Sequence, residues 1–215
     1  GIRVAPAVTI QGAKALADGS ASDVKSLRGK VVTAVFPDCV YVQEQNSPFG
    51  IKLVTSASVT AGEEVDVCGV MRGSGSERYL DCTGNPVMTT SPGPGVPGPF
   101  AAASSALGGA ELNSFTPGVV GGIGPNNIGS FVIAFGKVTQ RKTSAPKYFY
   151  IDDGCAIGDG TDTGGVENVG MRIAGDPASY AEGSYVFVMG VVSCFDSAGL
   201  RPQILPTEIQ ILRGP

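Results

Sequence analysis

The chain repeats one series of short blocks in the same order, and this repeat constrains its fold more than any other feature. The first series is Gly29-Lys30-Val31-Val32-Thr33, Val40-Tyr41-Val42-Gln43-Glu44 and Gly50-Ile51-Lys52-Leu53-Val54. The second is Gly136-Lys137-Val138-Thr139, Phe149-Tyr150-Ile151-Asp152-Asp153 and Gly170-Met171-Arg172-Ile173. A further matched block follows each series, at 62–70 and at 182–191. Matched blocks in one order predict two copies of one structural unit.

The composition indicates an all-β fold for both copies. Glycine accounts for 32 of 215 residues and charged residues for 16%, which suits short strands joined by many turns. We expect strands near 28–36, 39–45, 49–54, 64–72 and 78–83, and again near 131–139, 147–152, 169–174, 184–193 and 200–211. Five short strands with a glycine bend in the first describe a small OB-like barrel, so we predict two tandem OB-like five-stranded barrels.

These barrels divide the chain into four parts. We expect an N-terminal extended arm at 1–24, a first OB-like domain at 25–90, a Gly/Pro-rich connector at 91–129 and a second OB-like domain at 130–215. The connector has the composition of a flexible linker, yet large apolar residues such as Phe100, Leu107 and Phe115 are spread along it. An ordered strap packed on a domain surface and a disordered linker are the two readings.

Several blocks carry a family resemblance. They are Lys30-Val31-Val32-Thr33, Tyr41-Val42-Gln43-Glu44, Gly183-Ser184-Tyr185-Val186 and Gly190-Val191-Val192-Ser193-Cys194. The chain resembles the tandem OB-like repeats of large secreted bacterial proteins over about four fifths of its length. This resemblance implies the barrel fold and an extracellular or cell-surface location, and it brings no catalytic residues.

Five cysteines suggest disulfides. Cys68 and Cys82 flank a turn symmetrically, so they could face each other across two antiparallel strands, or they could be two buried thiols. Cys155 and Cys194 form the natural second pair. Cys39 is then left over, either buried or bridging to another chain. Disulfides would place the protein outside the cytosol.

Charge and motifs exclude several function classes. The net charge is −4 without a basic run, which argues against a nucleic-acid partner, and no apolar stretch is long enough to span a membrane. The chain has no histidine to form a zinc site or to activate a cysteine nucleophile. We therefore expect no enzymatic activity.

Carboxylates gather near one glycine-rich loop. Asp152, Asp153, Asp159, Asp162 and Glu167 could supply oxygen ligands to calcium, although their spacing matches no EF-hand. A solvated acidic loop is the simpler interpretation, and no cofactor is otherwise expected.

The expected function is that of a structural protein that associates with itself. The N-terminal segment is apolar and extended, and it is either an ordinary first strand or a strand offered to a neighbouring molecule. In the second case Ile2, Val4, Val8 and Ile10 would form a head-to-tail joint, and repeated joints would build a fibre or a surface assembly.

The alternative function is an OB-fold module that binds an oligosaccharide or single-stranded nucleic acid. Its face would use Tyr41, Tyr79, Phe149 and Tyr150, although these rings also suit a barrel core. Ser91 and Thr116 each precede a proline and could accept O-linked sugar.

Overall fold

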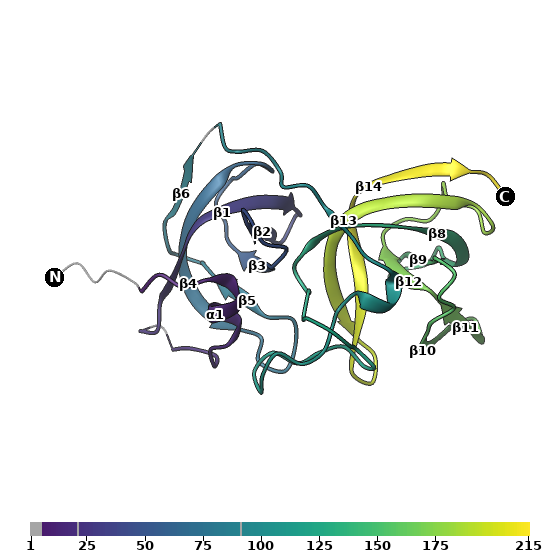
Figure 1. Ribbon diagram of the computed structural model, residues 1–215, viewed down its shortest axis with the longest axis horizontal. Coiled ribbons are helices and arrows are strands. Elements are labelled where there is room, and N and C mark those ends of the chain that lie inside the picture. Colours follow the sequence, from purple (N-terminus) through teal and green to yellow (C-terminus); the bar gives the residue numbers. More distant parts are fainter. Residues whose placement is uncertain (1–5, 21, 91) are drawn as a thin grey trace. The chain divides into compact units, whose positions relative to one another are not determined.

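The computed structural model describes residues 6–20, 22–90 and 92–215, and its regular structure is almost entirely β (Figure 1). The chain forms two compact units. The first comprises 1–98, 111–117 and 129–131, and the second comprises 99–110, 118–128 and 132–215.

The first unit contains a closed five-stranded barrel. Its strands are β1 (Lys25–Val35), β2 (Val40–Glu44), β3 (Gly50–Val54), β4 (Glu64–Arg72) and β5 (Tyr79–Asp81), and β6 (Val87–Thr90) adds an edge to β4. The order β1-β2-β3-β5-β4 is closed by pairing between β4 and β1, and β3 and β5 are parallel. This arrangement fits an OB-like barrel.

A bend in β1 makes closure possible. The first half of β1 pairs with β4, and the second half pairs with β2. The register shifts between Leu27 and Lys30, where Gly29 adopts a φ of +60°. Since glycine has no Cβ, it takes this left-handed conformation at little cost and lets the strand turn from one neighbour to the other.

The described part of the N-terminal arm packs against the barrel of the first unit. Ala7 forms a parallel bridge with Ser26, and the amide of Val8 donates to the Ser26 carbonyl at 2.9 Å. The chain then enters the short helix α1 (Ile10–Lys14), where Ile10 and Ala13 are fully buried in the barrel core. The prediction that Ile10 continues an extended strand is therefore wrong.

The second unit has strands in a corresponding order. They are β8 (Phe131–Lys142), β9 (Tyr148–Asp152), β12 (Met171–Ala174), β13 (Tyr185–Asp196) and β14 (Leu200–Arg213). Pairings join β8 to β9, β9 to β12, β12 to β14 and β14 to β13, and β13 also pairs with β8. The short strand β7 (Phe100–Ala101) runs parallel to β8, and η1 (Ser104–Ala106) leads to Leu107 in the core.

The sequence repeat extends to individual hydrogen bonds. The ladder between the first two strands is irregular at Thr33 in the first unit and at Thr139 in the second. The Thr33 hydroxyl donates to the Tyr41 carbonyl at 3.2 Å, and the Thr139 hydroxyl donates to the Tyr150 carbonyl at 3.4 Å. Threonine therefore occupies the same bulge in both units and supports it in the same way.

The turn before the fourth long strand is also repeated. Gly62 and Gly183 have φ near +90°, and their amides donate to the carbonyls of Val32 and Val138 at 2.8 and 2.9 Å. Each turn is thereby tied to the first strand of its unit.

Parts of the predicted connector contact the two units. The Thr116 hydroxyl donates to the Lys14 carbonyl at 2.6 Å within the first unit. Within the second unit, the amide of Val120 donates to the Leu200 carbonyl at 2.8 Å. The segment 99–110, placed in the connector from sequence, carries β7 and η1 of the second unit.

None of the five cysteines, all of which the structure describes, forms a disulfide, so both predicted bridges are corrected. Cys82 lies in the barrel core with Leu80, whereas Cys68 occupies a half-buried position that alternates with the buried Val65 and Val67 of β4. The two side chains therefore lie on opposite faces, as a one-residue offset in a strand requires.

The structure also shows where the other three cysteines lie. Cys155 is exposed in the loop after β9, and Cys194 lies within β13, where it pairs with Pro202 of β14. Cys39 is buried, which does not suit a bridge to another chain.

Candidate functional site

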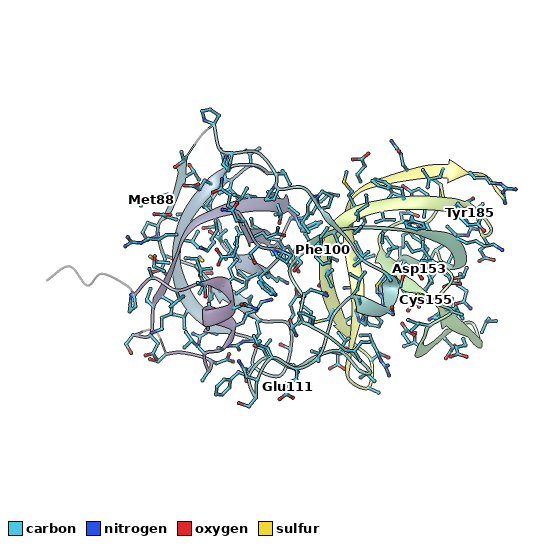
Figure 2. The ribbon with its side chains drawn as sticks, viewed as in Figure 1. Met88, Phe100, Glu111, Asp153, Cys155 and Tyr185 are labelled. Atoms are coloured by element: carbon cyan, nitrogen blue, oxygen red, sulfur yellow. The ribbon has the colours of Figure 1, made fainter. Side chains whose placement is uncertain are left out.

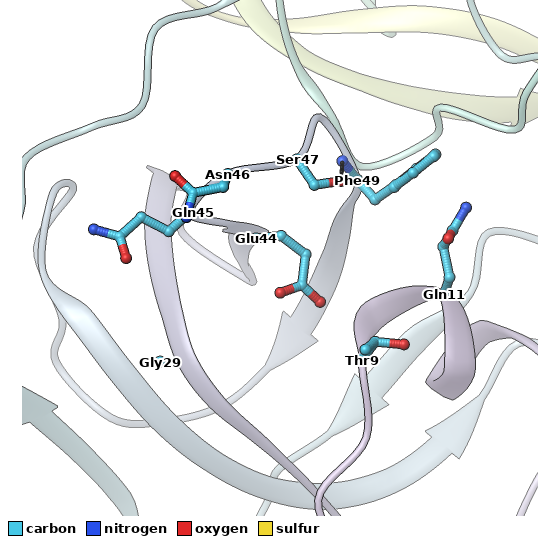
Figure 3. Close-up of a pocket in the computed structure, with 8 residues that line it drawn as sticks. All are labelled: Thr9, Gln11, Gly29, Glu44, Gln45, Asn46, Ser47 and Phe49. Carbon is cyan, nitrogen blue, oxygen red and sulfur yellow. Dashed lines mark hydrogen bonds between the residues drawn. The ribbon is translucent and has the colours of Figure 1, made fainter.

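A polar pocket of about 340 Å³ lies beside the N-terminal arm of the first unit (Figure 3). Its walls come from the arm, the bend of β1 and the turn between β2 and β3. The lining residues are Thr9, Gln11, Gly29, Glu44, Gln45, Asn46, Ser47 and Phe49. The sequence predicts no site at these residues, although Gln45, Asn46 and Ser47 form a polar run after β2.

Glu44 connects the arm to the barrel at this pocket. One carboxylate oxygen accepts the amide hydrogen of Ile10 at 2.8 Å, and the other lies 2.9 Å from the Lys30 ammonium. Lys30 also donates to the Arg28 carbonyl at 2.8 Å. The negative charge of Glu44 is thus balanced by Lys30 and oriented by a backbone donor.

Neutral hydrogen-bonding groups surround Glu44. Figure 3 shows its side chain between Gln45 and Asn46 on one side and Thr9 and Gln11 on the other. The three carboxamide side chains are exposed, so their donors and acceptors are open to solvent. Phe49 is half-buried and packs against the core, which fixes its ring at the pocket wall.

The second unit has an apolar hollow of about 530 Å³ beside its own arm. It is lined by Ala101, Ala102, Ala103, Ile133, Phe135, Asp153, Cys155 and Phe187. The amide of Ser104 donates to Asp153 at 2.7 Å, and Figure 2 shows Asp153 next to Cys155. Burial alone would raise the pKa of Asp153, but hydrogen bonds from Ser104 and Cys155 hold it below its ordinary value.

The two cavities occupy equivalent positions in the repeat. Tyr41 aligns with Tyr150, so Glu44 aligns with Asp153 and Asn46 with Cys155. In each unit a carboxylate at the end of the second strand accepts an amide hydrogen from the first residue of the short helix in the arm, Glu44 from Ile10 and Asp153 from Ser104. The repeat therefore builds one location twice, polar in the first unit and apolar in the second.

The aromatic ligand face expected from sequence is buried. Tyr41, Phe149 and Tyr150 are each at most 1% exposed, and Tyr79 is half-buried on β5. The Tyr41 hydroxyl donates to Glu77 at 2.7 Å, and Phe149 stacks on Tyr180 with ring centroids 5.1 Å apart. Buried rings cannot stack on a nucleic-acid base or a sugar, so Tyr41, Phe149 and Tyr150 are corrected from a ligand face to buried positions.

An insertion covers the aromatic face in the second unit. The hairpin of β10 (Gly158–Thr163) and β11 (Val166–Val169) lies between β9 and β12 in sequence. The Tyr150 hydroxyl donates to Asp159 at 2.7 Å, and the Tyr148 and Thr163 hydroxyls lie 3.3 Å apart. Burial raises the pKa of Tyr150 well above its ordinary value, so the phenol stays protonated.

The carboxylates predicted to bind calcium accept hydrogen bonds from nearby backbone amides and hydroxyls instead. Asp152 accepts the amide hydrogen of Ala156 at 2.9 Å, and Asp162 accepts that of Gly165 at 3.0 Å. Asp159 is buried and accepts from Tyr150 and Thr161, while Asp153 accepts from Ser104. Among the described residues, no three His, Cys, Asp or Glu side chains could hold a metal together, so the calcium expectation is corrected.

Of the two residues predicted to accept O-linked sugar, the structure describes Thr116. Thr116 is 2% exposed and its hydroxyl is hydrogen-bonded, so a glycosyltransferase could not reach it in the folded unit. Ser91 lies outside the described residues.

Comparison with known proteins identifies no family. No family model matches the chain, and no curated protein does. One similar solved structure is a murine DNA-binding protein bound with double-stranded DNA. It is 10% identical over 88% of this chain and 95% of its own, and its TM-score of 0.39 carries no argument about this protein. Within the described residues, no helix is long and apolar enough to cross a membrane.

Proposed function

We propose that the protein is a non-catalytic structural protein whose copies associate head-to-tail through an open sheet edge of the second unit. The proposal includes an OB-like barrel in each unit, with the connector acting as a strap, and an extracellular or cell-surface location. Because no disulfide forms, that location is supported by the resemblance to secreted proteins alone.

The C-terminal half of β14 carries the proposal. β14 pairs with β12 at Gln203 and Ile204, and beyond this point it pairs with β13 only, within the described part of the chain. From Thr207 to Arg213 one side of the strand therefore has no strand partner among the described residues. Unpaired backbone donors and acceptors at such an edge are a template for a strand of another chain.

The side chains at this edge favour association. Ile211 is 50% exposed, Leu212 60%, and Tyr185, which pairs with Arg213, 43%. Natural edge strands are usually protected by lysine, proline or a cover, and apolar side chains on both faces offer no such protection. We propose a second copy of the chain as the partner that covers them.

The N-terminal part of the expected joint needs revision. Ile10 is buried in its own barrel, and Val8 packs against that core, so neither is available to a neighbour. Ile2 and Val4 lie outside the described residues. They precede the docked arm and alternate along the sequence, and we propose them as the strand that reaches the β14 edge of the next copy.

Introducing lysines at the exposed edge of β14 tests the proposed self-association. The variant Ile211→Lys/Leu212→Lys should remain monomeric at concentrations at which the wild-type chain forms linear assemblies, as seen by sedimentation velocity and negative-stain electron microscopy. Val166→Lys is the matched control, because Val166 is 60% exposed on a hairpin of the same unit. This control should assemble as the wild type does.

Removing residues 1–5 tests the partner strand while leaving the docked arm in place. This truncated chain should also remain monomeric. A wild-type chain that is monomeric throughout, or an edge variant that assembles normally, would sink the proposal.

A further inference from the structure

We propose that the polar pocket of the first unit, beside Glu44, binds a neutral oligosaccharide. This binding function is separate from self-association, because the pocket and the β14 edge belong to different units. The inference depends on the charge, the hydrogen-bonding groups and the ring that the pocket presents.

The charge of the pocket favours an uncharged ligand. Of the eight described residues that line it, Glu44 alone is charged, and Lys30 balances that charge at 2.9 Å. A phosphate or sulfate would meet a carboxylate and no unpaired cation in the lining. A cationic ligand would have to compete with Lys30 for Glu44.

The polar groups match vicinal hydroxyls. Each carboxamide of Gln11, Gln45 and Asn46 offers both donors and an acceptor from one planar group. A hydroxyl is likewise both a donor and an acceptor, so a pair of sugar hydroxyls can bond to one carboxamide in both directions. The carboxylate of Glu44 is already held by the Ile10 amide, so its remaining lone pairs are positioned without further ordering.

The apolar wall suits the other face of a sugar ring. Phe49 is anchored by the core, and its ring is the aromatic group among the described residues that line the pocket. A volume of about 340 Å³ lies at the small end of the range for ligand sites, which is enough for one or two sugar rings. Binding through few contacts of this kind is weak for one site and gains strength when copies are joined in an assembly.

The hollow of the second unit can be compared with the pocket of the first, because the two occupy equivalent positions. When the units are aligned on the bulges at Thr33 and Thr139, Phe135 stands where the first unit has Gly29. Cys155 stands where it has Asn46. Alanines 101–103 line the arm side of the hollow. Asp153 is the acceptor that this hollow shares with the first unit, but no carboxamide is among its described lining residues. It therefore offers fewer groups to a pair of sugar hydroxyls, and we expect the glycan site in the first unit alone.

Saturation-transfer difference NMR with the full-length protein tests this proposal. The method observes the sugar, so it works equally for monomers and assemblies and does not depend on the proposed self-association. The probes are maltohexaose, cellohexaose and chitohexaose, with an oligothymidylate as the anionic comparison. We expect a saturable transfer signal from at least one of the sugars and none from the oligothymidylate.

Substitutions at exposed residues of the pocket test whether the sugar binds there. Gln45→Ala/Asn46→Ala should weaken sugar binding by about tenfold or more, the effect of removing hydrogen bonds worth about 1.4 kcal/mol in total. Cys155→Ala, at the equivalent position of the second unit, should bind as the wild type does. Absence of transfer from all three sugars, or equal binding by the double variant, overturns the proposal, as does binding of the oligothymidylate alone.

Discussion

At the scale of single residues, each unit contains a buried tyrosine whose hydroxyl donates to a carboxylate. Tyr41 donates to Glu77 and Tyr150 donates to Asp159, each at 2.7 Å. A buried phenol without a partner would cost about 1–3 kcal/mol, so the carboxylate stabilises the aromatic side chain inside the fold. The same residues that suggested a ligand face in the sequence thus contribute to the core.

The buried thiols of the first unit predict an alkaline loss of stability. Burial raises the pKa of Cys39 to about 11 and that of Cys82 to about 12, from an ordinary value of 9.0. The folded state therefore holds these protons more tightly than the unfolded state. The stability that they contribute is fully present below about pH 9 and is lost as the pH rises through about 11 to 12.

Urea unfolding followed by circular dichroism between neutral pH and pH 11 measures this loss. The double variant Cys39→Ala/Cys82→Ala should show a shallower decline in the unfolding free energy than the wild type. An identical decline in both proteins would mean that other groups cause it.

At the scale of elements, each unit has an arm that packs an apolar side chain into its core. The bridge between Ala7 and Ser26 corresponds in the repeat to the pairing of Phe100 with Val132. Each arm then turns into a short helical segment that brings an apolar side chain into the core, Ile10 in the first unit and Leu107 in the second. The repeating module is therefore an arm followed by strands that pair in a corresponding order.

Ile10→Ala should destabilise the first unit by about 2–5 kcal/mol, because it leaves a cavity in a core position that is fully buried. Met88→Ala on β6 is the control, since Met88 is 64% exposed and its truncation should change the unfolding free energy by less than about 0.5 kcal/mol. Urea unfolding compares the two variants. Equal effects would show that the arm is not part of the folding unit.

The sequence predicted the elements with regular patterns well. The strands near 64–72 and 184–193 match β4 and β13, because alternating apolar residues and a preceding glycine turn are local signals. The sequence allows either one helical turn or a short arm at 11–17, and the structure has α1 at Ile10–Lys14. Five residues leave no measurable period to decide between the two, and burial of Ile10 and Ala13 stabilises the helix.

The candidate site was harder to predict than the strands. The pocket combines the arm, a β1 bend and a turn that are separated by up to 40 residues, and a pattern within one segment does not reveal such proximity. The disulfide prediction failed for a related reason. Symmetry about a turn does not determine which face of a strand each cysteine occupies, and a one-residue offset places them apart.

At the scale of the whole molecule, the two units present edges of the same kind. β6 pairs with β4 in the first unit, as the end of β14 pairs with β13 in the second. In the first unit the chain continues beyond β6 into the connector. A contact with the next copy at β14 would repeat along a linear assembly, since the donor and acceptor surfaces differ.

Amide hydrogen exchange of residues 207–213 in the full-length chain tests this account most directly. In dilute protein the amides that do not pair with β13 should exchange quickly, because they face solvent. As the concentration rises and copies associate, these amides should become protected, while exchange in the hairpin of β10 and β11 stays unchanged. Exchange at 207–213 that remains fast at every concentration would contradict the proposed joint.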